Sequence, residues 1–135
     1  MQKTVTISKD HRNTLISHAK KQFPNESCAL LFGTEENGSF QISDVFLTQS
    51  SGPSPREFTI ANEDLIRGYN EAERLDLDVI GIFHSHPHSE AAPSQTDRKY
   101  MEVNPVVWVI FSNKYEDLKA YVLESDIVAV PVKIE

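Results

Sequence analysis

The stretch VIGIFHSHP, at residues 79–87, decides the expected fold of this chain and indicates its chemistry. Residues 79–83 form a short apolar run, which is typical of a central β-strand. His84, Ser85 and His86 follow directly, and Pro87 cannot donate a hydrogen bond to a strand ladder. The sequence therefore predicts a central strand that carries two histidines at its C-terminal end.

The segments on either side predict helices packed against a sheet. Residues 28–32 form another apolar run, expected to be a strand that ends at Gly33 and is buried on both faces. The turn signal at residues 35–38 predicts antiparallel pairing with residues 40–48. Further strands are expected at residues 5–8, 58–60, 106–111, 118–123 and 127–134, and helices at about residues 8–23 and 62–75 and from residue 94. This order indicates an α/β fold with one mixed sheet.

The length and composition suit one globular domain over residues 1–135. The chain has 39% hydrophobic and 24% charged residues, and it shows no internal repeat. Its formal net charge of -7 argues against nucleic acid as a partner, because an acidic surface repels phosphate backbones. We therefore expect one compact domain that binds no nucleic acid.

The cysteine content and the apolar segments indicate the compartment. Cys28 is the one cysteine of the sequence, which excludes an intramolecular disulfide and a zinc site built on cysteines. Residues 1–10 contain no apolar signal segment, and no apolar run approaches the ~18 residues of a membrane span. We expect a cytoplasmic protein that does not associate with a membrane.

The two histidines predict a metal site. Side chains at positions i and i+2 of an extended segment project from the same face, so His84 and His86 can approach one metal ion. Asp97, at the start of the next helix, supplies a carboxylate close in sequence, and the fourth position of a tetrahedral zinc site can hold water. Peptide cleavage also needs a proton acceptor, for which Glu26 is the candidate. Glu26 lies 58 residues before His84, and the sequence alone does not show that the two adjoin.

These positions resemble the signature of the JAMM or MPN+ (Mov34/MPN/PAD-1) zinc metalloproteases. That signature is an upstream Glu, then His-x-His, seven residues and Ser-x-x-Asp, and it is matched here by Glu26, His84, His86, Ser94 and Asp97. The resemblance extends to residues 26–33 and 81–83 and to the order of elements over nearly the whole chain. It therefore covers both the motif and its setting.

The resemblance implies a set of roles and a fold. His84, His86 and Asp97 would bind one zinc ion per chain, Glu26 would be the general acid/base, and Ser94 would help to stabilise the oxyanion. The implied fold is the three-layer MPN arrangement, similar to cytidine deaminases, with a mixed, mostly antiparallel sheet flanked by helices. The implied activity is cleavage of peptide or isopeptide bonds after the C-terminal Gly of ubiquitin or ubiquitin-like proteins.

One departure concerns the loop before Ser94. Residues 90–93 resemble prokaryotic members of the family, whereas the eukaryotic proteasome-lid enzyme has a Trp before the matching Ser. The leading expectation is therefore a zinc isopeptidase or peptidase acting on conjugates of a ubiquitin-like or sulfur-carrier protein. Two alternatives stay open: trimming of sulfur-carrier precursors in cofactor biosynthesis, and a non-catalytic MPN scaffold, which the complete ligand set disfavours.

The substrate tail is expected to bind extended along a strand edge. Phe58, Thr59 and Ile60 are the candidate edge residues, and the loops at residues 49–55 and 90–93 are candidates for ordering on substrate binding. His88, just past the motif, is interpreted as a loop residue. The sequence does not settle the oligomeric state, and a homodimer stays open as an alternative.

Several of these residues also have ordinary structural interpretations. Ser94 and Asp97 match a helix capping box, and a capping role can coexist with a role in the site. Cys28 and Trp108 are expected in the core. His11 and His18 are expected to be surface or packing residues of the first helix.

Overall fold

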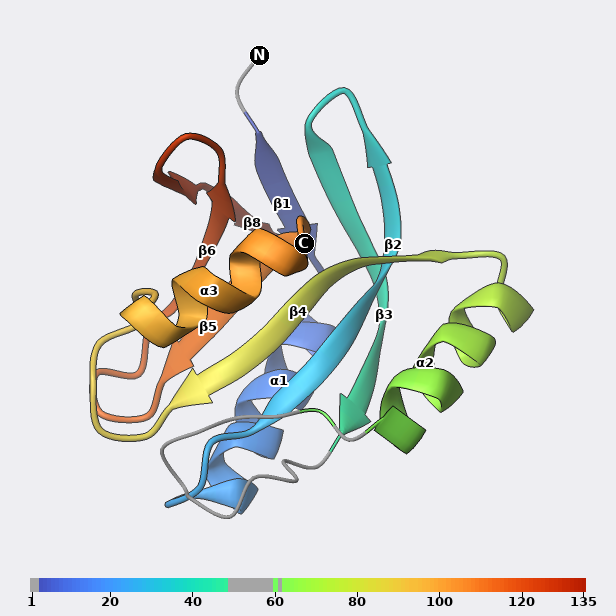
Figure 1. Ribbon diagram of the computed structural model, residues 1–135. Coiled ribbons are helices and arrows are strands. Elements are labelled where there is room, and N and C mark those ends of the chain that lie inside the picture. Colours follow the sequence, from blue (N-terminus) through green and yellow to red (C-terminus); the bar gives the residue numbers. More distant parts are fainter. Residues whose placement is uncertain (1–2, 49–59, 61) are drawn as a thin grey trace.

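The computed structural model describes residues 3–48, 60 and 62–135, which form eight strands and three helices (Figure 1). The elements, in chain order, are β1 (Thr4–Ile7), α1 (Lys9–Gln22), β2 (Cys28–Glu36), β3 (Ser39–Thr48), α2 (Asn62–Arg74), β4 (Asp78–His86), α3 (Gln95–Val103), β5 (Val107–Ser112), β6 (Leu118–Leu123), β7 (Ile127–Val130) and β8 (Val132–Ile134). No helix within these ranges is long and apolar enough to cross a membrane.

All the strands belong to one mixed sheet in the order β7-β6-β5-β4-β2-β3-β1-β8. The hairpin of β2 and β3 is antiparallel, and so are the pairs β2–β4, β5–β6 and β6–β7. The pairs β4–β5, β1–β3 and β1–β8 are parallel. The predicted mixed, mostly antiparallel sheet is therefore confirmed, and β4 lies at its centre.

Helices cover both faces of this sheet, which gives three layers. Along β2, Ala29 and Leu31 belong to a core cluster that includes residues of α1, whereas Leu30 and Phe32 belong to a second cluster that includes residues of α2 and α3. Figure 1 shows α1 behind the sheet and α3 across its front. Because both faces are covered, β2 carries a continuous apolar run rather than an alternating pattern.

The last segment of the chain joins the two edges of the sheet. Residues 127–134 were expected to form one strand, but Pro131 divides them into β7, which pairs with β6, and β8, which pairs with β1. Proline has no N–H to donate to a ladder, so the pairing is interrupted there. The Pro131 carbonyl accepts a hydrogen bond from the Val5 N–H at 2.9 Å. β7 and β8 are the two edge strands and only one residue joins them, so the sheet must curl until these two edges lie close to one another.

Two other predicted boundaries were too short. β2 does not end at Gly33 but continues to Glu36, with an irregularity in its pairing with β3 between Phe32 and Gly33. β4 continues through His86, because Ser85 and His86 pair with the last two residues of β5. The strand expected at residues 58–60 is represented only by Ile60, which forms an isolated bridge; Phe58 and Thr59 lie outside the described residues.

Gly33 generates the first testable prediction. A Cβ atom at this position would lie 1.8 Å from the Gln41 carbonyl oxygen, so one strand of the hairpin must move to admit a side chain. Gly33→Ala is expected to lower the free energy of unfolding by about 1–3 kcal/mol, as overpacked sites do. Urea denaturation measures the change. The matched control is Thr34→Ala at the next, exposed position of β2, and equal stability of the two variants would contradict the prediction.

Candidate metal centre

A β-bulge sets the direction of the histidine side chains. Leu31 of β2 pairs with Gly81 of β4, but the next residue, Phe32, pairs with Val79, so Ile80 is an extra residue in β4. A bulge of this kind reverses which face the following residues occupy. The result is that the histidine end of β4 is presented to the face covered by α3.

His84 and His86 lie on this face together. Ile82, two residues earlier, belongs to the core cluster that contains Trp108 and the α3 residue Met101. His84 is fully buried with its ring edge-on to Trp108, 5.8 Å between centroids, and the rings of His84 and His86 are 4.8 Å apart. The i and i+2 positions therefore converge, as expected from an extended strand.

Asp97 reaches the same point from the first turn of α3. Its Oδ2 lies 3.1 Å from Nε2 of His86 and 3.4 Å from Nε2 of His84. The predicted capping box is present: Ser94 Oγ accepts from the Asp97 N–H at 3.1 Å, and Asp97 Oδ2 accepts from the Ser94 N–H at 2.9 Å. Capping therefore fixes the carboxylate that faces both histidines.

The pairing of β2 with β4 brings Glu26 into the same group. Cys28 pairs with His84, and the Ser85 N–H donates to the Ser27 carbonyl at 3.0 Å, so Glu26 comes opposite His86. One carboxylate oxygen of Glu26 and one nitrogen of each histidine all lie within 4.8 Å of one another. The structure thus brings together Glu26, His84, His86 and Asp97, although Glu26 lies 58 residues before His84 in the sequence.

Opposing effects set the protonation of the buried groups. Burial lowers the pKa of His84. Burial also acts to lower the pKa of His86, but hydrogen bonds with Asp97 and with the Glu90 carbonyl outweigh it, and the pKa is raised. Burial acts to raise the pKa of Asp97, but the two histidines hold it well below its usual range. Asp97 is therefore an anion next to two imidazoles.

A network of hydrogen bonds holds the loop between β4 and α3. His86 Nδ1 donates to the Glu90 carbonyl at 2.8 Å, which leaves Nε2 directed at Asp97. The Ser89 carbonyl accepts a hydrogen bond from Ser112 Oγ at 2.7 Å. The Ala91 carbonyl accepts one from the Tyr121 hydroxyl at 2.6 Å. Ser112 and Tyr121 were not predicted from the sequence, because no local pattern links them to loop residues 23 and 30 positions away.

The structure also places the other residues that were singled out in the sequence. His88 is exposed and its ring contacts Phe23 edge-on, with 5.5 Å between centroids. Ile60 is half-buried and packs against the cluster that contains Trp108. His18 is a packing residue, as expected, whose Nε2 donates to the Thr48 carbonyl at 2.9 Å. Trp108 and Cys28 are in the core, and burial raises the pKa of Cys28 to about 11.

The donor set fits a zinc ion. Ligand atoms bound to one tetrahedral zinc at about 2.0–2.1 Å lie about 3.3 Å apart. The two distances from Asp97 Oδ2 to the histidine nitrogens, 3.1 and 3.4 Å, match this spacing. Imidazole nitrogens with a carboxylate oxygen are also the ligand types of catalytic zinc sites.

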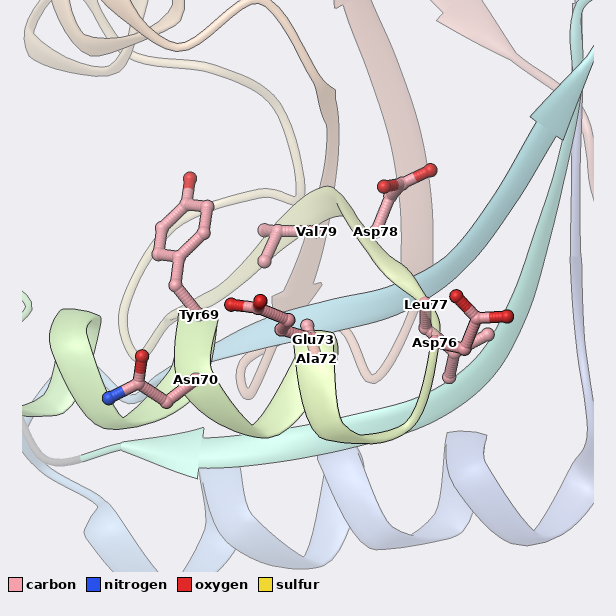
Figure 2. A pocket seen from close by; sticks show the side chains of 8 residues that line it. All are labelled: Tyr69, Asn70, Ala72, Glu73, Asp76, Leu77, Asp78 and Val79. Carbon is pink, nitrogen blue, oxygen red and sulfur yellow. The ribbon is translucent and has the colours of Figure 1, made fainter.

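A surface pocket of about 560 Å³ lies elsewhere, between the last turns of α2 and the start of β4 (Figure 2). Tyr69, Glu73, Asp76 and Asp78 are among the residues that line it. Since β4 begins at Asp78 and carries the histidines at its other end, this pocket is separate from the metal centre.

Comparison with known proteins identifies the family of the chain. A family model described as prokaryotic homologs of the JAB domain matches residues 8–124. The chain belongs to this family. The chain is 36% identical over 109 residues to a desampylase of Pyrococcus furiosus, covering 81% of this chain and 74% of that protein. It is 25% identical over 134 residues to a CysO-cysteine peptidase of Mycobacterium tuberculosis, covering 96% and 90%.

The fold of the JAB domain also matches solved structures. The solution structure of a Desulfitobacterium hafniense protein superposes with a TM-score of 0.88 and 21% identity, over 98% of this chain and 93% of that one. At this identity the likeness shows the fold alone. The predicted family and its α/β fold are confirmed.

The loop network generates the second prediction. Tyr121→Phe removes the donor to the carbonyl of Ala91, a residue that is only 1% exposed. A buried acceptor without its donor costs about 1–3 kcal/mol, so the variant is expected to unfold at lower urea concentration. Tyr115→Phe, at an exposed tyrosine, is the matched control. The prediction is wrong if Tyr121→Phe keeps the wild-type midpoint.

Proposed function

We propose that the chain is a zinc-dependent peptidase that cleaves ubiquitin-like or sulfur-carrier proteins from their conjugates after a C-terminal Gly. The observation that carries the proposal is the shared Asp97 oxygen, 3.1 and 3.4 Å from the two histidine nitrogens, with the Glu26 carboxylate within reach. A non-catalytic scaffold would not need this complete set of groups.

His84, His86 and Asp97 are the residues that would hold the metal. Their side chains are buried, and each is oriented by a separate contact: His84 by Trp108, His86 by the Glu90 carbonyl, and Asp97 by the capping box. When bound, zinc supplies a Lewis acid and lowers the pKa of its water from about 15.7 toward about 7.

Glu26 is assigned the proton transfer, and Ser94 the stabilisation of the oxyanion. The Glu26 carboxylate accepts a proton from the attacking water and delivers it to the leaving nitrogen, the usual task of a general acid/base. Ser94 Oγ already accepts the Asp97 N–H, so its own hydroxyl proton can be donated to the oxygen that becomes negative.

The names of the relatives support the substrate class. A desampylase and a CysO-cysteine peptidase are among the proteins that the chain resembles. The second name supports a sulfur-carrier protein as the substrate. In both cases the tail of the substrate would bind extended beside a strand, with Ile60 as the one described residue of the candidate edge. A cytoplasmic location belongs to the same proposal.

The zinc content of two variants tests the assignment of the ligands. Asp97→Asn is expected to weaken zinc binding at least about tenfold, because a ligand loses its charge, whereas Glu26→Gln keeps the metal. Zinc per chain after gel filtration is measured by mass spectrometry. Ser94→Ala is the control for loss of the helix cap, since it keeps the carboxylate. The opposite result, with zinc lost only from Glu26→Gln, would make Glu26 the ligand.

Cleavage assays test the activity itself. The zinc-loaded protein is incubated with linear and isopeptide-linked fusions of ubiquitin-like and sulfur-carrier proteins that end in Gly. Glu26→Gln is expected to lower kcat at least about 100-fold, because the general acid/base is lost. Cleavage of sulfur-carrier fusions alone would identify a sulfur-carrier protein as the substrate. The proposed mechanism is excluded if the wild type cleaves none of the fusions, or if Glu26→Gln cleaves them equally well.

A further inference from the structure

Ser85, between the two histidines, faces the opposite side of β4. His84 and His86 point toward α3, so the intervening side chain must project to the other face of the strand. Ser85 is 0% exposed, and Ser27, its neighbour on the chain that leads into β2, is 1% exposed. Two buried hydroxyls therefore meet directly behind the candidate metal centre.

The two serines form an irregular antiparallel pair at the end of the ladder between β2 and β4. In each hydrogen-bonded pair of a regular antiparallel ladder, the two opposed residues exchange two backbone N–H to carbonyl hydrogen bonds. Here the Ser85 N–H donates to the Ser27 carbonyl at 3.0 Å, but the Ser27 N–H donates to the Ser85 hydroxyl oxygen at 2.9 Å. The Ser27 hydroxyl also donates to Ser85 Oγ at 2.9 Å. One side chain thus replaces a backbone acceptor.

This replacement fixes where the chain leaves the sheet. β2 begins only at Cys28, so Glu26 and Ser27 precede its regular pairing. Because the Ser27 N–H donates to Ser85 Oγ, the Ser27 amide is directed at this side chain rather than at the backbone carbonyl of Ser85. Glu26 directly precedes Ser27, so the direction of its backbone follows from the hydrogen bonds between Ser27 and Ser85.

We propose that Ser85 is a positioning residue for Glu26: its hydroxyl holds the Ser27 amide so that the Glu26 carboxylate stands beside the two histidine nitrogens. The inference rests on the proposed function, because it assumes that Glu26 transfers the proton. Without the hydroxyl, the buried Ser27 N–H either loses its acceptor or moves to the Ser85 carbonyl, and both outcomes displace Glu26. A displacement of about 1 Å can cost about 100-fold in rate.

Kinetics of Ser85→Ala in the zinc-loaded protein test this role. With the Gly-terminated fusion that the wild type cleaves, kcat is expected to fall about 10- to 100-fold, with KM and zinc content unchanged. Ser85→Thr keeps the hydroxyl oxygen and is expected to restore kcat to within about threefold of wild type. Ser27→Ala keeps the backbone N–H that donates to Ser85 Oγ, so its loss is expected to be smaller than that of Ser85→Ala.

A double-mutant cycle separates positioning from general damage. If Ser85 acts through Glu26, Ser85→Ala should change kcat little in a chain that already carries Glu26→Gln. The inference is overturned if Ser85→Ala keeps the wild-type kcat, loses zinc, or lowers kcat equally in both backgrounds. Those results leave the proposed function intact, whereas full activity of Glu26→Gln alone would remove the proposed function first.

Discussion

The antiparallel pairing of β2 with β4 is the constraint on which the site depends. It places Glu26 opposite His86, and the extra residue Ile80 within it determines which face receives the histidines. A slip of one residue in this register would send both imidazoles into the layer occupied by α1. Because β2 and β4 are central strands with neighbours on both sides, the register is fixed by the surrounding sheet rather than by the site.

Asp97 shows how one side chain serves folding and chemistry together. Its carboxylate closes the capping box of α3 and also faces two buried imidazoles. Burial of a carboxylate is costly unless charge and hydrogen bonds compensate for it, and here both come from residues that the fold already needs in place. The position of α3 and the electrostatics of the site are therefore linked, and neither can change without the other.

Local patterns predicted much of this molecule. The apolar runs, the turn before β3 and the helix caps gave most elements, and the spacing of His84, His86 and Asp97 anticipated their convergence. Features that depend on distant pairing were not predictable in this way. The bulge at Ile80, the pairing of β8 with β1 and the contact of Tyr121 with the loop all arise between segments far apart in the sequence. Periodicity carries no information about such pairs.

The division at Pro131 has a consequence for how the chain is assembled. β1 consists of residues 4–7, yet one of its two partners, β8, consists of residues 132–134. On a ribosome, that side of β1 remains an unpaired edge until β8 has emerged. The pairing of β1 with β8 therefore waits for the later strand and spans a sequence separation of the kind that slows folding.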